Sequence, residues 1–200
     1  MRITLTLRTC TKTRTMKLND FVRVYDNVLP LSLCDILIET FEASTHKEVV
    51  DNDYKPFFTQ LNLTKNYTDW NEAIISTAIK CFSEYALELR DWAQFLKGNQ
   101  LALEEFRIKR YNSGTGEQFD THVDACNLES SKRYLSMLFY LNDDFTGGET
   151  VFLPGEFDQL EVKPKKGSVL MFPPTWQYPH AGLPLITGTK YIMSTYMNFV

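Results

Sequence analysis

The sequence predicts an α+β chain that is mainly β, in which an antiparallel double-sheet jelly roll carries helices packed on one outer face. Three observations predict this fold. Two long segments with helical periodicity precede residue 90. From residue 103 onward the pattern changes to short strand-like runs with no helical pattern between them. Glycine and proline residues punctuate those runs, as expected for the turns of an antiparallel sheet.

Two helices are predicted in the first half of the chain. The first runs from Ser32 to about Ala43 and opens with Ser-x-x-Asp, which resembles a capping box. The second runs from about Asp69, which can cap it, to Leu89. Apolar side chains at helical spacing predict one buried stripe on each helix. The stripes are Cys34, Leu37, Ile38 and Phe41, and then Ile74, Ala78, Cys81, Phe82, Tyr85 and Leu89.

The stretch between the helices, roughly residues 46–67, is polar and contains Pro56 and several asparagines. It predicts irregular or weakly β structure, and loops of this length are often lids. One hypothesis is that residues 48–66 close over a bound substrate with an apolar underside. The alternative is that the same aromatic residues pack on the helices. They are Tyr54, Phe57 and Phe58.

The second half of the chain predicts five strands, which are rich in β-branched and aromatic residues. They are Leu103–Tyr111, Tyr134–Leu141, Thr150–Leu153, Ser168–Phe172 and Lys190–Phe199. The last strand is the most informative, because side chains alternate between the faces of a sheet. One face reads as core, and the other begins with Lys190 and carries Ile192, Ser194, Tyr196 and Asn198. A lysine inside a barrel needs a counter-charge, and a dicarboxylic ligand would supply it.

Composition indicates one globular domain over residues 17–200 of this 200-residue chain, preceded by a basic leader over residues 1–16. The leader is compatible with an upstream start, a transit peptide, a disordered arm or an extra strand. The net charge of -4 argues against a nucleic-acid partner. The chain contains no run of about 18 apolar residues, so no membrane span is predicted. We expect a cytoplasmic monomer with no membrane partner.

The four cysteines have irregular spacing and form no CxxC pair, which predicts reduced thiols. Cys34 and Cys81 fall on the apolar helix stripes and are expected in the core. Cys126 lies two residues after Asp124 and could sit near a metal. A packed or half-exposed thiol is the favoured interpretation, because thiolates suit zinc better than an oxygen-activating iron.

Two of the three histidines predict a metal site. His122 and Asp124 are two residues apart, so on an extended strand they point to the same side. A second strand could bring His180 to the same point. Two imidazoles and one carboxylate form the facial triad of non-haem iron(II) oxygenases. The alternatives are a salt-bridged surface pair for His122 and Asp124 and a core or loop histidine for His180.

A series of motifs in this order resembles the prolyl 4-hydroxylases, within the iron(II)- and 2-oxoglutarate-dependent dioxygenases. The motifs are Phe106-Arg-Ile-Lys-Arg-Tyr111, His122-Val-Asp124, Arg133, Phe139-Tyr-Leu-Asn142, Gly147-Gly-Glu-Thr150 with Val151 and Phe152, Phe172-Pro-Pro174, and His180-Ala-Gly with Pro184, Gly188, Lys190 and Tyr191. The resemblance covers roughly residues 21–199. It implies a double-stranded β-helix, which is a jelly-roll variant, and hydroxylation of a peptidyl proline with iron(II), 2-oxoglutarate, oxygen and ascorbate.

The resemblance also implies a role for individual residues. His122, Asp124 and His180 would bind iron. Lys190 would pair with the distal carboxylate of 2-oxoglutarate. Tyr140 and Ser194 would hydrogen-bond that same end of 2-oxoglutarate. Tyr111 would hold the cosubstrate near the iron. Arg133 and Tyr196 would lie beside the peptidyl substrate.

Several positions depart from the family pattern and leave the substrate open. Phe119 stands where relatives often have tyrosine, and Tyr196 stands where they often have tryptophan. The cosubstrate cation is a lysine ten residues after His180, as in collagen-type members, whereas the glycine-rich run after Tyr111 looks like that of the oxygen sensors. Three alternatives therefore stay open. They are a small-molecule substrate, an alkylated nucleic-acid base, and a jelly-roll binding module without turnover.

Overall fold

The structure is a computed structural model that describes residues 18–51, 57–67, 71–89, 99–153 and 159–200. The basic leader, Cys10, Tyr54 and the proposed cap Asp69 lie outside the described residues. The assignment of residues 17–200 to one domain stays a prediction. No helix within the described segments combines the length and apolarity that a bilayer crossing requires.

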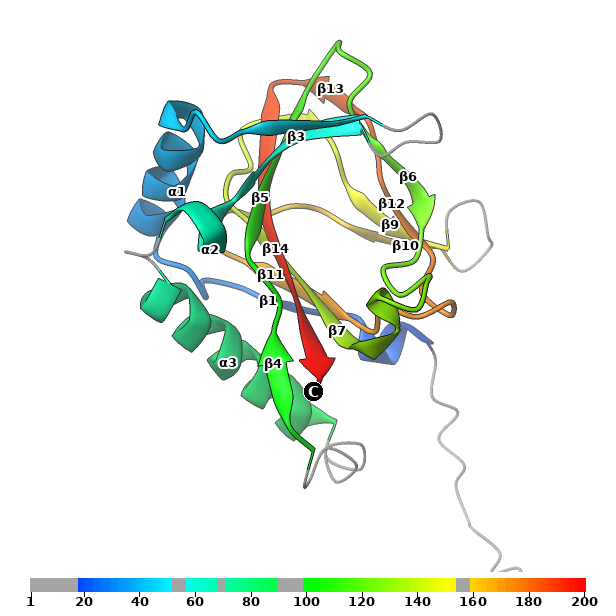
Figure 1. The fold of residues 1–200 in the computed structure, drawn as a ribbon. Coiled ribbons are helices and arrows are strands. Elements are labelled where there is room, and N and C mark those ends of the chain that lie inside the picture. Colours follow the sequence, from blue (N-terminus) through cyan, green and yellow to red (C-terminus); the bar gives the residue numbers. More distant parts are fainter. Residues whose placement is uncertain (1–17, 52–56, 68–70, 90–98, 154–158) are drawn as a thin grey trace, which may run out of the picture.

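Two antiparallel sheets face each other, as the jelly-roll prediction requires (Figure 1). The major sheet has eight strands in the order β1-β11-β7-β14-β5-β3-β2, with β4 also paired to β14. The minor sheet has the order β10-β9-β12-β6, and β13 pairs with β8 separately. The bounds are β1 Arg23–Tyr25, β2 Glu48–Asp51, β3 Phe57–Asn62, β4 Leu101–Leu103, β5 Arg107–Asn112, β6 Phe119–His122, β7 Arg133–Tyr140, β8 Thr146–Gly147, β9 Thr150–Phe152, β10 Leu160–Val162, β11 Val169–Phe172, β12 His180–Gly182, β13 Leu185–Thr187 and β14 Thr189–Phe199.

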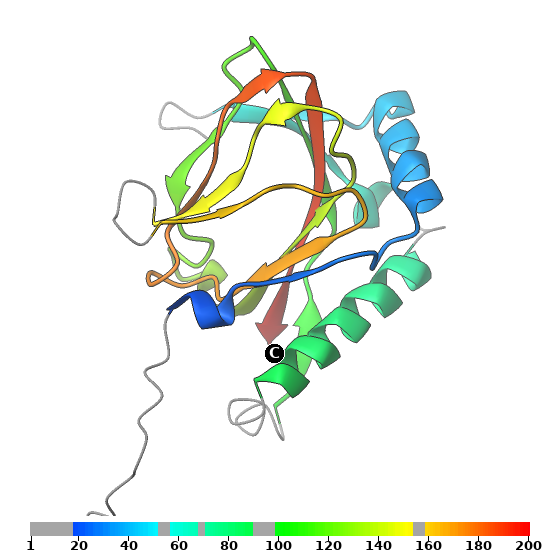
Figure 2. The same ribbon diagram turned by 180° about the vertical axis from the view of Figure 1, so that it is seen from behind.

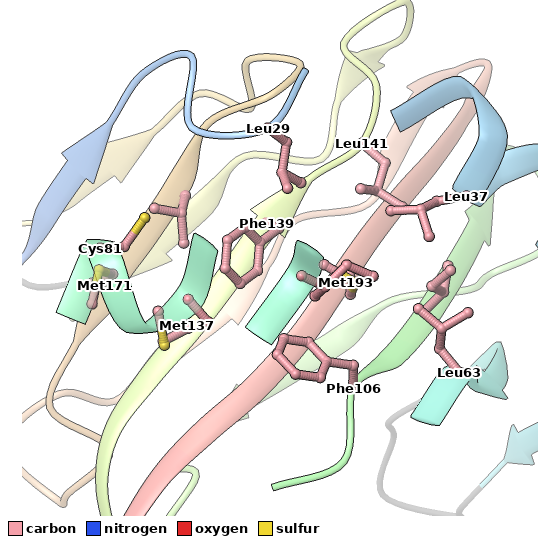
Figure 3. Packing of buried hydrophobic residues seen from close by; sticks show 14 of the residues in the cluster. Leu29, Leu37, Leu63, Cys81, Phe106, Met137, Phe139, Leu141, Met171 and Met193 are labelled. Atoms are coloured by element: carbon pink, nitrogen blue, oxygen red, sulfur yellow. The ribbon is translucent and has the colours of Figure 1, made fainter. Parts of the chain in front are cut away.

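The helices cover the outer face of the major sheet (Figures 1 and 2). They are α1 Leu31–Ala43, α2 Leu63–Asn66 and α3 Asn71–Glu88, and a 3-10 turn spans Leu18–Phe21. The predicted stripes on α1 and α3 are confirmed, because their apolar side chains lie buried in one cluster with the sheet. Figure 3 shows members of this cluster, including Leu37 of α1, Cys81 of α3, Phe139 of β7 and Met193 of β14.

The alternation along β7 and β14 separates this outer core from the barrel interior. Met137 and Phe139 point to the helices, whereas Leu138 and Tyr140 point inward to a second cluster. On β14, Met193 likewise points to the helices and Ile192 points inward. A register slip of one residue would move every buried side chain to the wrong face. Since each large apolar side chain contributes about 1.5–3 kcal/mol when buried, the register is strongly defined.

The predicted capping box at Ser32 is wrong. Helix α1 begins at Leu31 with Pro30 at the N-cap position, and no side chain caps it. Ser32 therefore lies inside the first turn. Proline fits here because its fixed φ suits the entry to a helix and the first N–H groups of a helix lack an intrahelical partner in any case.

The stretch between the helices, predicted to be irregular or weakly β, contains two strands of the major sheet. Residues 48–51 and 57–62 form β2 and β3, and β3 pairs with β5 inside the major sheet. Phe58 is 3% exposed and packs in the barrel interior rather than on the helices. β-branched and aromatic residues favour the pleated sheet once a partner strand is available. The pairing with β5 is nonlocal, so the local polar pattern did not reveal it.

The predicted strand Leu103–Tyr111 is interrupted by a bulge at residues 104–106. Leu103 pairs with Met197 and Arg107 with Ser194, so three residues lie on this side of β14 against two on the other. A bulge redirects a side chain. Here it places the Glu104 carboxylate next to Arg133, in the half-buried ion pair described below.

Candidate metal centre

Three side chains from the minor sheet and the loop after β6 converge at one end of the barrel interior. One ligand atom from each of His122, Asp124 and His180 lies within 4.8 Å of the others. The Asp124 carboxylate lies 3.6 Å from His122 Nε2 and 3.7 Å from His180 Nε2. The two histidines come together because they are directly paired across β6 and β12. The expected juxtaposition of the three predicted ligands is therefore present.

Backbone carbonyl groups orient both imidazole rings. His122 Nδ1 lies 2.7 Å from the Asp120 carbonyl oxygen, and His180 Nδ1 lies 3.1 Å from that of Tyr178. With the proton on Nδ1, each ring presents the Nε2 lone pair to the centre. Phe119 stacks on His122 at 3.5 Å between ring centroids, which further restrains that ring.

Asp124 connects the minor sheet with the major one. Ser136 Oγ on β7 donates to one carboxylate oxygen at 2.6 Å, and the Tyr196 hydroxyl on β14 donates to the other at 3.1 Å. Arg133 Nη1 also donates to the Asp124 backbone carbonyl at 2.7 Å. These contacts hold a carboxylate that follows β6 in a loop, where it would otherwise be free to rotate.

The protonation states suit metal binding. Burial lowers the pKa of His180 to about 4 against the opposing attraction of Asp124, so this ring is neutral at pH 7. Burial on its own would raise the pKa of Asp124, but His180, His122 and Ser136 outweigh it and hold that pKa well below its usual range. Two imidazoles and one carboxylate form a donor set that fits a first-row divalent ion such as iron(II).

Arg133 is committed to neighbouring protein groups. Its Nε and Nη2 each lie 2.9 Å from the Glu104 carboxylate, and its guanidinium stacks on the Tyr196 ring at 3.7 Å from the centroid. The Glu104 partner was missed by sequence reasoning, because the pair spans 29 residues and depends on the bulge. The pair positions Tyr196 and, through it, Asp124.

We expect Glu104→Gln to lower the melting temperature by about 4–8 °C. The substitution leaves the Arg133 charge without its half-buried partner, at a cost of about 2 kcal/mol, and a domain of this size loses about 2–4 °C per kcal/mol. Glu105→Gln is the matched control, because Glu105 belongs to a more exposed pair with Arg107 and should change the melting temperature little. Equal melting temperatures for both variants in thermal denaturation would contradict the structural role of the Glu104 pair.

Lys190 lies at the inner end of the same cavity. It is 5% exposed, and its ammonium donates to the Gly148 carbonyl oxygen at 2.5 Å. Gly148 has a φ of +70°, and a Cβ there would approach Leu185 to 2.7 Å, which explains the glycine in the Gly147-Gly-Glu-Thr150 motif. Burial lowers the pKa of Lys190 to about 8, with Glu149 opposing the shift. The lysine is therefore still largely charged at pH 7.

Two of the three other predicted cosubstrate residues lie near Lys190. The Lys190 ammonium is 5.9 Å from the ring centroid of Tyr111 and 5.7 Å from that of Tyr140. Thr150, which sequence reasoning did not single out, bonds to the Tyr140 hydroxyl at 2.9 Å and lines the cavity. Ser194 is not brought to this end: it lies four residues along β14, about 13 Å away at the usual rise, and lines an outer groove instead.

A second buried lysine, Lys109 on β5, is a further residue that sequence reasoning missed. It is 8% exposed and lines both the inner cavity and the outer groove, together with His122 and Asp124. The period of two on β5 could have revealed it, because Lys109 and Tyr111 share a face. Cys126, exposed and unpaired, lines the outer groove, whereas Cys34 and Cys81 are buried as predicted.

Comparisons with known proteins agree with this site. Residues 106–198 match the model of the 2OG-Fe(II) oxygenase superfamily, a range that contains the three candidate ligands and both buried lysines. "Probable prolyl 4-hydroxylase 9" of Arabidopsis thaliana is 30% identical in an alignment 119 positions long, which covers 48% of this chain and 41% of that relative. The chain thus aligns with less than half of that relative's length.

Solved structures share the fold. A viral collagen prolyl hydroxylase from Paramecium Bursaria Chlorella virus-1, in its 2OG complex, has a TM-score of 0.63 at 21% identity, over 90% of this chain and 97% of that one. A Trichoplax adhaerens prolyl hydroxylase in complex with a hypoxia inducible factor peptide fragment has a TM-score of 0.69 at 15% identity, over 89% and 83%. These structures share the fold, while the family model and the curated relative show that residues 106–198 are similar in sequence to 2OG-Fe(II) oxygenases and that part of the chain is similar to a prolyl 4-hydroxylase.

Proposed function

We propose that this protein is an iron(II)- and 2-oxoglutarate-dependent dioxygenase that hydroxylates a proline in a peptide or protein. The observation that carries the proposal is the arrangement of one cavity. His122, Asp124 and His180 converge on one wall, and Lys190 lies buried at the inner end. Iron(II) with 2-oxoglutarate and oxygen would supply the oxidative chemistry that converts a C–H bond to C–OH.

The chain's own residues would bind and orient the reactants. Lys190 would pair with the distal carboxylate of 2-oxoglutarate. At that depth water does not solvate the carboxylate, so it needs a cation as its partner. Tyr111 and Tyr140 would form the walls beside this carboxylate, with the Tyr140 hydroxyl directed by Thr150. Apolar side chains such as Leu185 and Ile192 in the same cavity would exclude water from the reaction.

The peptide would lie in the outer groove, next to the metal centre. Arg133, Ser194 and Tyr196 line this groove with Phe58 and Phe119, so the predicted substrate-proximal positions of Arg133 and Tyr196 open onto it. The relatives named above carry prolyl hydroxylase names, and one was solved with a peptide fragment. Ascorbate dependence, a monomeric state and a cytoplasmic location are part of the proposal and rest on the sequence alone.

The direct test is iron-dependent conversion of 2-oxoglutarate to succinate in the presence of proline-containing peptides. We expect turnover that rises with a prolyl peptide, that does not rise when the proline is replaced by alanine, and that adds one oxygen atom to the peptide by mass spectrometry. Turnover stimulated only by a small molecule or an alkylated base would replace the proposed substrate. Absence of iron-dependent succinate formation under all these conditions would favour a binding module.

A further inference from the structure

Lys109 is a buried cation that the proposed chemistry does not use. It is 8% exposed, and its ammonium lies 5.2 Å from the ring centroid of Phe58 and 5.6 Å from that of Phe119. Within the described part of the chain its ammonium forms no hydrogen bond or ion pair. Aromatic faces attract an ammonium group but do not neutralise it. Asp124 attracts this ammonium but forms no ion pair with it, and a buried lysine without a paired counter-charge is costly, which is the reason to look for a ligand.

The strand pairing places Lys109 at the junction between the inner cavity and the outer groove. Tyr111 pairs with Lys190 at the inner end, Lys109 pairs with Ile192 one step outward, and Arg107 pairs with Ser194 beyond it. Tyr111 and Lys190 line the inner cavity alone. Arg107 and Ser194 line the groove alone, whereas Lys109 lines both. A ligand that reaches from the groove toward the candidate metal therefore passes the Lys109 ammonium.

Lys109 is also the cation lining the groove that has no ion-pair partner among the described residues. Arg133 is paired with Glu104, and Arg107 is paired with Glu105. Among the described residues that line the cavity or the groove, Asp124 is the sole acid, and it is a candidate metal ligand whose charge would be used by the metal. With Lys190 assigned to the cosubstrate, Lys109 is left with a positive charge that a second anion would balance.

We propose that Lys109 binds a carboxylate of the primary substrate, next to the carbon that is hydroxylated. This proposal rests on the proposed function, because it assumes that the groove holds the substrate. The carboxylate comes from an acidic residue beside the target proline or from the free carboxyl group of a terminal proline. Either source gives the same charge-assisted hydrogen bond to a lysine at the cavity mouth.

The cosubstrate is the competing ligand for this lysine. Lys190 and Lys109 project from adjacent positions of neighbouring strands, and along either strand the two levels differ by two residues, about 7 Å. Lys190 already has the deeper position with Tyr111, Tyr140 and Thr150 around it. Lys109 instead faces Phe58 and Phe119, which line the groove. The contacts of Lys109 thus favour the substrate over the cosubstrate.

The test measures binding without turnover, by calorimetry on protein loaded with Mn²⁺ and saturating 2-oxoglutarate under nitrogen. One pair of probes is acetyl-Ala-Pro-Glu-Ala-amide and its glutamine analogue. The other pair is acetyl-Ala-Pro as the free acid and as the amide. Lys109→Met removes the charge with little change of volume, and Lys109→Arg retains the charge. Lys80→Met, on the exposed face of α3, is the matched control.

We expect the wild type and Lys80→Met to bind one acid about tenfold to a hundredfold more tightly than its neutral analogue, the range for a hydrogen bond between charged groups. The pair that shows the difference identifies the source of the carboxylate. Lys109→Met should lose the difference while its affinity for the neutral analogue and for 2-oxoglutarate stays unchanged, and Lys109→Arg should keep most of it.

Three results would overturn the proposal. They are equal binding of acid and neutral probes by the wild type, no binding of either acid, and a Lys109→Met variant that loses 2-oxoglutarate affinity but keeps the acid preference. Because the readout is binding, it is separate from the proposed hydroxylation. A Lys109-dependent acid preference in a protein that never oxidises a prolyl peptide would contradict the proposed reaction alone.

Discussion

Asp124→Ala is expected to abolish iron-dependent turnover of 2-oxoglutarate and to weaken divalent metal binding by more than about a hundredfold. Loss of an outer partner of a metal ligand typically costs about 10–100-fold, so loss of the ligand itself costs more. The Asp124 carboxylate is the one anionic donor of the triad and faces both histidine Nε2 atoms. His122→Ala should have the same effect, because it leaves two donors on the metal.

Two variants calibrate this result. His46→Ala should be silent, because His46 is exposed and is not among the residues that line the cavity or the outer groove. Ser136→Ala removes the hydroxyl that donates to Asp124 at 2.6 Å and should weaken metal binding about 10–100-fold. Metal affinity is measured by titration with Mn²⁺ or Fe²⁺, and circular dichroism checks the fold. Near wild-type turnover in folded Asp124→Ala would remove the metal assignment.

Lys190→Ala is expected to raise the apparent KM for 2-oxoglutarate by about 10–150-fold. A hydrogen bond to a charged group contributes about 1.5–3 kcal/mol, and each 1.4 kcal/mol is tenfold in affinity. The effect should fall on KM rather than on metal affinity, since Lys190 lines the same cavity but is not one of the three candidate ligands. Binding of 2-oxoglutarate to the Mn²⁺-loaded variant by calorimetry gives the same quantity without turnover.

Lys190→Arg separates charge from shape at this position. The guanidinium keeps the charge, but it is larger and planar, and Gly148 leaves little room because the Lys190 chain already lies 3.3 Å from where a Cβ would stand there. We expect a milder rise in KM than for alanine, but a measurable one. An unchanged KM in Lys190→Ala would show that the distal carboxylate is bound elsewhere, with Lys109 as the next candidate.

Local periodicity was sufficient for much of the fold. The stripes of α1 and α3, the inward and outward faces of β14 and the jelly-roll class were all predicted, because burial on one face imposes a period of 3.6 on helices and of two on strands. The same rule led to the expectation that His122 and Asp124 share one side, although Asp124 lies in the loop after β6 rather than on the strand, and motif order added His180 and Lys190. Each of these inferences needs only neighbouring residues or a family pattern.

Pairing between distant strands decided the rest. β3 is a central strand because it pairs with β5, although its own polar context suggested a loop. The bulge at residues 104–106 is defined by pairing with β14. It brings Glu104 next to Arg133, which is 29 residues away in the sequence. Ser194 and Lys190 are separated by their distance along β14. The pairing of β5 with β14 makes Lys109 a buried cation beside the candidate metal centre.

The physical reason for this division is the range of the interactions. Helix caps, stripes and alternation depend on residues a few positions apart, which the sequence displays directly. Burial of a charge depends on which strands lie beside it. The arrangement of the strands is determined by the total apolar surface that the two sheets and the helices remove from water. The sequence alone thus determined the candidate ligands and the fold class, while the tertiary structure decided which polar groups and which buried cations surround them.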